Sequence, residues 1–157
     1  MQRKYNIPDY NKHLSLKVGS GLWLVFLYLL RPYIILIASI VNRSDRMGLI
    51  NMIYEDKLPM SLSAAAAIPT LFVIYAWLRR VPDATDTVKS IWSKGRLLLG
   101  CSAALDCVVV YVPIYIGVVS KLSNLAWIQL GLSAFILLYI VFSGRVKDTF
   151  TDFPENE

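Results

Sequence analysis

Hydrophobic residues in this chain gather in four long blocks, and the segments between the blocks carry most of the charge. A helix needs about 20 largely apolar residues to cross the roughly 30 Å hydrocarbon core of a bilayer. Each block reaches that length and predicts one membrane-spanning helix. The predicted spans are about residues 19–41, 59–78, 97–119 and 122–142. The last two are so close together that we expect a tight helical hairpin, because about 46 residues are too many for one crossing.

Polar segments stand at both ends of the chain. A leader, residues 1–18, precedes the first span, and a tail, residues 143–157, follows the last one. The first apolar block is much longer than the roughly 7–15 apolar residues of a cleaved signal peptide, and it lies behind the leader. We therefore interpret it as a retained helix of a polytopic, all-α membrane protein, a four-helix transmembrane bundle.

Two connecting segments have some helical character. In the loop 83–94, Val88, Ile91 and Trp92 are spaced three and four residues apart. This spacing predicts a short interfacial helix with these three side chains towards the bilayer. The segment 42–58 fits either a second interfacial helix or a loop with scattered apolar residues.

The distribution of basic residues predicts the orientation. If the four spans are correct, one side of the membrane holds the leader, the tail and the loop between the second and third spans, which we call the middle loop. This side carries 11 Lys and Arg, whereas the other side carries 4. Loops rich in Lys and Arg stay in the cytoplasm. Both termini are therefore expected to be cytoplasmic.

Composition excludes several classes of protein. Hydrophobic residues make up 56% of the chain and charged residues 17%, against roughly 45–50% and about 25% in soluble domains. Two cysteines exclude a disulfide-stapled secreted module. The net charge of +5 is modest and the basic residues flank the spans, so we expect the lipid bilayer, and no nucleic acid, as a partner.

The leader and the first span resemble a known family. The residues that carry the resemblance are, in order, Tyr10, Leu16-Lys17, Trp23-Leu24 and Leu29-Leu30-Arg31-Pro32-Tyr33. They are similar to the start of the YfeZ-like family of small, uncharacterised inner-membrane proteins of Gram-negative bacteria. The resemblance implies four spans and a bacterial inner-membrane location. It implies no activity, cofactor or catalytic residue.

Arg31 and Asp106 are the ionisable side chains inside the predicted spans. A charge at mid-bilayer costs about 2.5–3.5 kcal/mol on insertion scales, so such residues face the protein interior or water and find a partner. Arg31 lies 12 residues into the first span and Asp106 lies 9 into the third, which corresponds to depths of roughly 18 and 14 Å. These depths predict an intramembrane ion pair, which either fixes helix packing or serves as a relay or counter-ion. In the remaining alternative, Arg31 snorkels and Asp106 is protonated.

Polar side chains inside the spans predict contacts between helices. Ser102 shares a face with Asp106, while Gln129 and Ser133 share a face of the fourth span, with Tyr33 or Tyr111 at a compatible depth. Hydrogen bonds of this kind contribute about 0.6–2 kcal/mol each.

Small residues suggest close helix packing. Gly100 and Ala104 are four apart in the third span, a spacing that allows helix backbones to approach closely. The spacing fits either the core of one copy or a dimer interface.

The chain shows no catalytic, metal-binding or phosphate-binding motif, so we expect no enzyme activity and no cofactor. The favoured function is a non-catalytic integral membrane protein that acts by binding other membrane proteins or itself. The alternative is a small oligomeric transporter or permeation unit built around the pair of Arg31 and Asp106.

Overall fold

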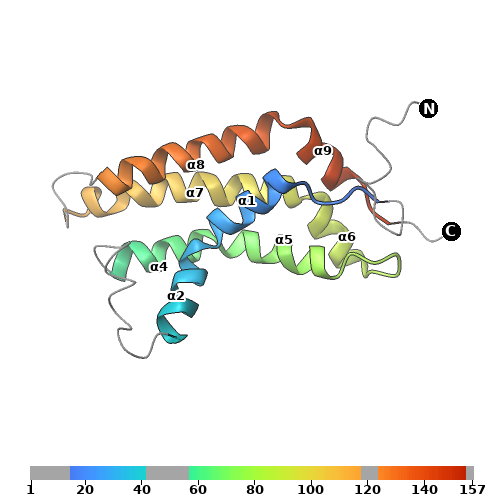
Figure 1. The fold of residues 1–157 in the computed structure, drawn as a ribbon, viewed down its shortest axis with the longest axis horizontal. Coiled ribbons are helices and arrows are strands. Elements are labelled where there is room, and N and C mark those ends of the chain that lie inside the picture. Colours follow the sequence, from blue (N-terminus) through green and yellow to red (C-terminus); the bar gives the residue numbers. More distant parts are fainter. Residues whose placement is uncertain (1–14, 42–56, 118–123, 155–157) are drawn as a thin grey trace.

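The computed structural model describes residues 15–41, 57–117 and 124–154. In these ranges the chain forms eight α-helices (Figure 1), which confirms the all-helical prediction. The helices are α1 (Ser20–Leu29), α2 (Arg31–Val41), α4 (Lys57–Ala66), α5 (Ile68–Leu78), α6 (Asp86–Ser93), α7 (Gly95–Tyr115), α8 (Asn124–Phe142) and α9 (Gly144–Thr151). The segment 42–56 and the predicted hairpin turn lie outside the described residues.

The long helices α7 and α8 correspond to the third and fourth predicted spans. Both are long and apolar enough to cross a membrane. They lie side by side along the length of the molecule (Figure 1). Helix α7 also contacts α1, α4 and α5, so it is the central helix of the fold.

The first and second predicted spans are each broken into two helices. The axes of α1 and α2 differ by 62°, and the two parts of the second span differ by 44°. Pro32 and Pro69 follow the breaks, and a proline inside a helix removes an N–H donor and clashes with the carbonyl four residues earlier. Two described helices therefore qualify as spans on their own, against the four predicted, and each bent pair qualifies only when it is counted as one span.

The predicted helix in the loop 83–94 is present as α6, but its expected orientation is wrong. Val88 and Trp92 are only 4% and 1% exposed, and both belong to the hydrophobic core of the protein. The ring of Trp92 lies 4.8 Å from that of Phe150 in α9. The apolar face of α6 thus packs into the core, against α5 and α9, rather than turning to the bilayer.

The predicted polar tail is partly structured. Ser143 begins α9 as its N-cap, where its hydroxyl accepts a hydrogen bond from the backbone N–H of Val146 at 3.4 Å. Val146 and Phe150 are buried in the core. In Figure 1, α6, α9 and the first described residues of the chain lie together at one end of the molecule.

The outer surface of the helices is largely apolar. Large hydrophobic side chains on α8 point away from the core, with Phe135 67% and Phe142 79% exposed. Helices α1, α2 and α5 expose similar residues. The core itself is concentrated between α1, α5, α7 and the end formed by α6 and α9.

Candidate functional site

Arg31 and Asp106 lie together in the interior, brought there by two different helices. Arg31 is the first residue of α2, directly after the break at Leu30, and Asp106 is in the middle of α7. One guanidinium nitrogen, Nη2, lies 2.9 Å from Oδ1 and 3.1 Å from Oδ2 of Asp106. The Arg31 side chain is 18% exposed and that of Asp106 6%. The break in the first predicted span thus places the arginine opposite the carboxylate.

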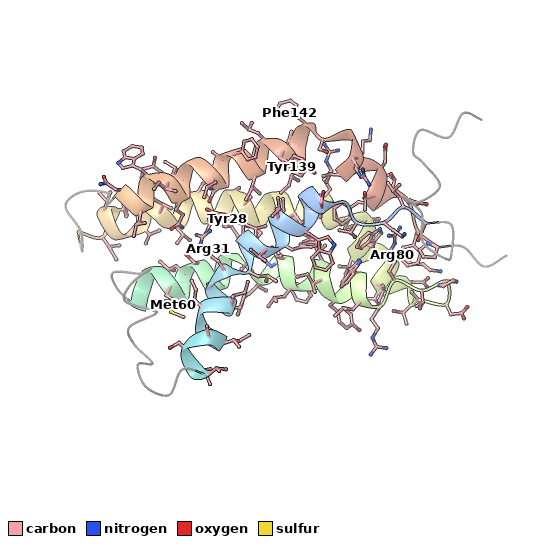
Figure 2. The ribbon with its side chains drawn as sticks, viewed as in Figure 1. Tyr28, Arg31, Met60, Arg80, Tyr139 and Phe142 are labelled. Carbon is pink, nitrogen blue, oxygen red and sulfur yellow. The ribbon has the colours of Figure 1, made fainter. Side chains whose placement is uncertain are left out.

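Two hydroxyl groups connect this ion pair to α8 and α1. Ser133 on α8 donates a hydrogen bond to Oδ2 of Asp106. The hydroxyl of Tyr28 on α1 lies 2.8 Å from Oγ of Ser133 and 2.9 Å from the carbonyl oxygen of Gln129. The guanidinium of Arg31 also faces the Tyr28 ring, with Cζ 4.4 Å from the ring centroid, and Figure 2 labels both side chains. We call Tyr28, Arg31, Asp106 and Ser133 the central network.

The central network joins four helices through one carboxylate. Asp106 accepts hydrogen bonds from a cation and from a hydroxyl, so its negative charge is compensated where it is buried. Buried charges of this kind are tolerated only when they are paired and hydrogen-bonded. Chemically, the arrangement can lock α1, α2, α7 and α8 in one register, or pass a proton along its hydrogen bonds.

Ser102 takes part in a separate contact, near the second helix break. It accepts a hydrogen bond from the hydroxyl of Thr70 at 3.0 Å and donates one to the carbonyl oxygen of Ala66 at 2.6 Å. The N–H of Thr70 binds the carbonyl of Ala67 instead of that of Ala66. Ser102 therefore donates to a backbone carbonyl that the helix break leaves without its usual N–H donor. Membrane helices that contain prolines need such replacement donors.

Sequence reasoning missed two residues of these contacts. The tyrosine near Ser133 is Tyr28, whereas Tyr33 donates to the carbonyl of Ala64 and Tyr111 is exposed. Gln129 contributes its backbone carbonyl to this hydrogen bond. Tyr28 could have been found, because it precedes Arg31 by three residues and such residues share a helix face. No such spacing in the sequence points to Thr70.

A second arginine, which is half-buried, lies at the end of the molecule formed by α6 and α9. Arg80 donates hydrogen bonds to the carbonyl oxygens of Leu16 at 2.9 Å and of Asp152 at 2.7 Å. Its guanidinium Cζ lies 4.6 Å from the ring centroid of Trp92. Burial lowers the pKa of Arg80, and the charge of Asp152 opposes that shift.

The same end holds further hydrogen bonds between distant segments. The backbone N–H of Leu16 donates to the carboxylate of Asp152. The indole N–H of Trp92 lies 3.1 Å from the carbonyl oxygens of Thr149 and Asp152. We call Leu16, Arg80, Trp92 and Asp152 the end cluster, which ties the leader, the middle loop and the tail together.

Among the described residues, no group of three His, Cys, Asp or Glu side chains could hold a metal ion. A family model described as "Protein of unknown function (DUF2919)" matches residues 5–152 of the chain. Searches of curated proteins and of solved structures give no match. The family match covers almost the whole chain and carries no description of an activity.

Proposed function

Because the chain belongs to the DUF2919 family, whose description assigns no activity, we propose a function from the geometry and the sequence pattern. We propose that the protein is a four-pass integral protein of the bacterial inner membrane with both termini in the cytoplasm. It is not an enzyme, and it acts by binding other membrane proteins or further copies of itself. The likeness of residues 10–40 to the YfeZ-like family supports the inner-membrane location.

The outer surface supports a place in the bilayer. Side chains such as Leu24, Ile40, Phe135 and Phe142 are more than half exposed on the outer faces of α1, α2 and α8. Leaving apolar area in water costs about 25 cal/mol per Å², and soluble monomers rarely expose large continuous apolar patches. Lipid tails around the helices remove this cost. When each bent pair is counted as one broken span, the chain crosses four times, which agrees with its two described ends lying at one end of the molecule (Figure 1).

The observation that carries the non-catalytic proposal is the internal compensation of the central network. Asp106 is engaged by Arg31 and Ser133, and Ser133 lies beside the hydroxyl of Tyr28. A charge pair that is satisfied within the protein is suited to fixing the packing of helices. The surface that meets partners is then the apolar exterior.

A second candidate function is a small oligomeric transporter or permeation unit that uses Arg31 and Asp106. The specific observation in its favour is the break between α1 and α2 directly at Arg31. Discontinuous helices with ionisable residues at the break occur at the binding sites of transporters. The continuous contacts from Arg31 through Asp106 to Ser133 would then serve as a relay.

Reporter fusions test the proposed topology. A fusion after Asp56 and a fusion at the C-terminus should report opposite compartments, with the C-terminal fusion in the cytoplasm, because the basic residues gather on that side. A periplasmic signal from the C-terminal fusion would contradict the proposal.

Isolation of the tagged full chain in a mild detergent tests the binding function. We expect a stoichiometric second membrane protein or a defined multimer of the chain. The variant with both Arg31→Leu and Asp106→Leu separates the two candidates, because a partner that binds the exterior stays bound when the folded double variant is isolated. A relay loses its charges in this variant, so in the transporter case the variant folds and transport is lost.

A further inference from the structure

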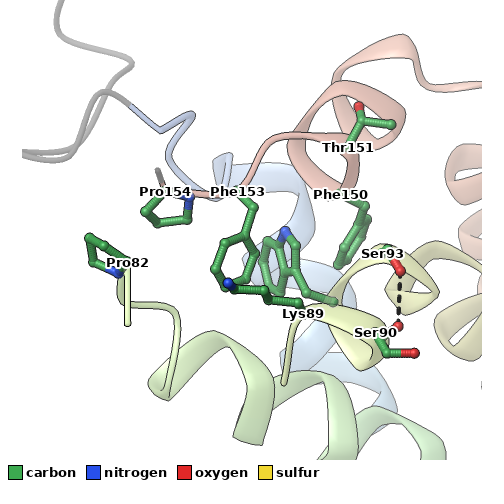
Figure 3. A pocket seen from close by; sticks show the side chains of 9 residues that line it. Pro82, Lys89, Ser90, Ser93, Phe150, Thr151, Phe153 and Pro154 are labelled. Carbon is green, nitrogen blue, oxygen red and sulfur yellow. Dashed lines mark hydrogen bonds between the residues drawn. The ribbon is translucent and has the colours of Figure 1, made fainter. Parts of the chain in front are cut away.

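A pocket of about 570 Å³ opens at the end of the molecule beside the end cluster (Figure 3). One wall is α6, with Lys89, Ser90 and Trp92, and the opposite wall is the tail, with Phe150 and Phe153. Small-molecule pockets typically have volumes of about 300–1,000 Å³. The pocket is therefore large enough for the headgroup of a lipid.

The walls of the pocket are held together by hydrogen bonds that lie behind them. Trp92 in one wall donates to the backbone carbonyls of Thr149 and Asp152 in the segment that forms the other. Arg80 donates to the carbonyl of Asp152 as well. Because the tail is fixed against α6 in this way, a ligand does not need to order it, which lowers the cost of binding.

The polar side chains that line the pocket favour a negatively charged ligand. Among the described residues that line the pocket, Lys89 is the one with a charged side chain, and Ser90 adds a hydroxyl. The hydroxyls of Ser93 and Thr151 donate to backbone carbonyls of their own helices. An ammonium group and a hydroxyl favour an anion with several acceptor oxygens, such as a phosphate ester.

The remainder of the lining is apolar and aromatic. Trp92 and Phe150 are buried beneath the pocket, and Phe153 lies beside Lys89, whose Nζ is 6.0 Å from the ring centroid (Figure 3). Such a surface suits a ligand that carries apolar groups next to its anionic group. A free inorganic ion would make no apolar contact with the half-buried Phe153 ring.

The position of the pocket points to the membrane as the source of the ligand. It lies just beyond the end of α5 and close to the start of α7, where Leu78 and Leu97 are 67% and 66% exposed. In the proposed topology these leucines reach the inner edge of the hydrocarbon layer, and the pocket lies at the level of the headgroups. The cytoplasmic leaflet is the one whose anionic lipids attract basic residues.

We propose that this pocket binds the headgroup of an anionic phospholipid of the cytoplasmic leaflet, with Lys89 and Ser90 contacting the phosphate and Phe153 contacting the apolar part. The inference rests on the proposed membrane topology. It assigns the end cluster a purpose beyond stability, because Arg80 and Trp92 keep the two walls at a fixed separation.

Native mass spectrometry of the full chain in a neutral detergent tests this site. The probes are phosphatidylglycerol, phosphatidylcholine with the same acyl chains, and soluble glycerol 3-phosphate. We expect phosphatidylglycerol to bind about fivefold more tightly than phosphatidylcholine, the effect of roughly one basic residue at a lipid surface. The variant Lys89→Gln should lose most of this preference. The matched control Lys147→Gln removes an exposed charge from α9 outside the pocket and should keep it.

Three results would overturn the inference. Equal losses from Lys89→Gln and Lys147→Gln would show attraction to the overall surface charge instead of a pocket. Binding of glycerol 3-phosphate as tight as that of the lipid would show a site for a free anion. Equal binding of the two lipids by the wild type would show no headgroup selection. In each case the C-terminal reporter fusion would still report the cytoplasm, whereas a failure of the proposed topology would appear as a periplasmic signal from that fusion.

Discussion

The central network and the end cluster each hold an arginine away from water, but they compensate its charge in different ways. Arg31 is paired with the carboxylate of Asp106 at the middle of α7. Arg80 is held by two backbone carbonyls and the face of Trp92, while the carboxylate of Asp152 accepts from a backbone N–H. The difference follows the position along the long axis of the fold, because Arg31 lies opposite the middle of α7, whereas Arg80 lies just beyond the end of α5.

A charge far from water needs an opposite charge, because dipoles alone do not repay its desolvation. Nearer to the surface, carbonyl dipoles and an aromatic face are sufficient to stabilise the charge of Arg80, and water can reach part of its guanidinium. The central network therefore fixes how α1, α2, α7 and α8 pack, whereas the end cluster holds Leu16 and Asp152 together. The two regions should therefore respond differently to the loss of one side chain.

The largest effect is expected from breaking the central pair. The variant Asp106→Leu leaves Arg31 as an uncompensated buried charge and should lower the free energy of unfolding by about 3–5 kcal/mol. Thermal unfolding in detergent and the folded yield measure this loss. The control Asp152→Leu removes the carboxylate of the end cluster, but Arg80 keeps its two backbone carbonyl acceptors, so this variant should cost clearly less. If the two variants lost the same free energy of unfolding, the central network and the end cluster would not differ in the way proposed.

A smaller loss is expected from Arg80→Gln. The change removes two hydrogen bonds to carbonyls and the contact with Trp92, and it should cost about 2 kcal/mol. It should also release the tail, so trypsin should cut at Arg145 and Lys147 faster than in the wild type. The neighbouring Arg79 is exposed, and Arg79→Gln is the matched control. If both variants are cut at the same rate, the end cluster does not hold the tail.

Packing at the end of the molecule can be probed through two glycines of α7. A Cβ on Gly95 would lie 2.4 Å from Cε1 of Phe150, whereas a Cβ on Gly100 would meet nothing within 4 Å. Gly95→Ala should therefore cost about 1–3 kcal/mol, because the buried Phe150 ring must move. Gly100→Ala should gain up to about 1 kcal/mol from helix propensity. A neutral Gly95→Ala would mean that α9 does not pack against the start of α7.

The smallest effect is expected from Ser102→Ala. The change leaves the hydroxyl of Thr70 and the carbonyl of Ala66 without this partner, and hydrogen bonds between membrane helices average about 0.6 kcal/mol. Urea or thermal unfolding of the purified chain measures the difference. The exposed Ser93→Ala serves as the control. A loss as large as that of Asp106→Leu would place Ser102 among the residues that carry the fold.

The positions of the helices could be predicted because length and hydrophobicity act locally. The expected spans 97–119 and 122–142 correspond to α7, Gly95–Tyr115, and α8, Asn124–Phe142. The size of the bend at Leu30 could not be predicted, because a proline breaks the helix but neighbouring helices set the angle. The depths of Arg31 and Asp106 predict that the two side chains can reach each other, and in the structure Nη2 of Arg31 lies 2.9 Å from Oδ1 of Asp106.

The surroundings of the individual side chains were less predictable. The spacing of Val88 and Trp92 identifies the apolar face of α6, but the elements that cover it are α5 and α9, the second of which is far along the chain. An amphipathic pattern shows that a face is buried and not what buries it. In the sequence Arg80 simply follows Arg79, and its partners come from Leu16 and Asp152, which are far away along the chain.

A double-mutant cycle on Arg31 and Asp106 tests the central claim most directly. The free energy of unfolding is measured for the wild type, Arg31→Leu, Asp106→Leu and the double variant, all in the same detergent. If the pair fixes helix packing, each single variant loses about 3–5 kcal/mol and the double variant loses less than either, because no unpaired charge remains. Single losses that add up in the double variant would contradict the account, since the two side chains would then act independently.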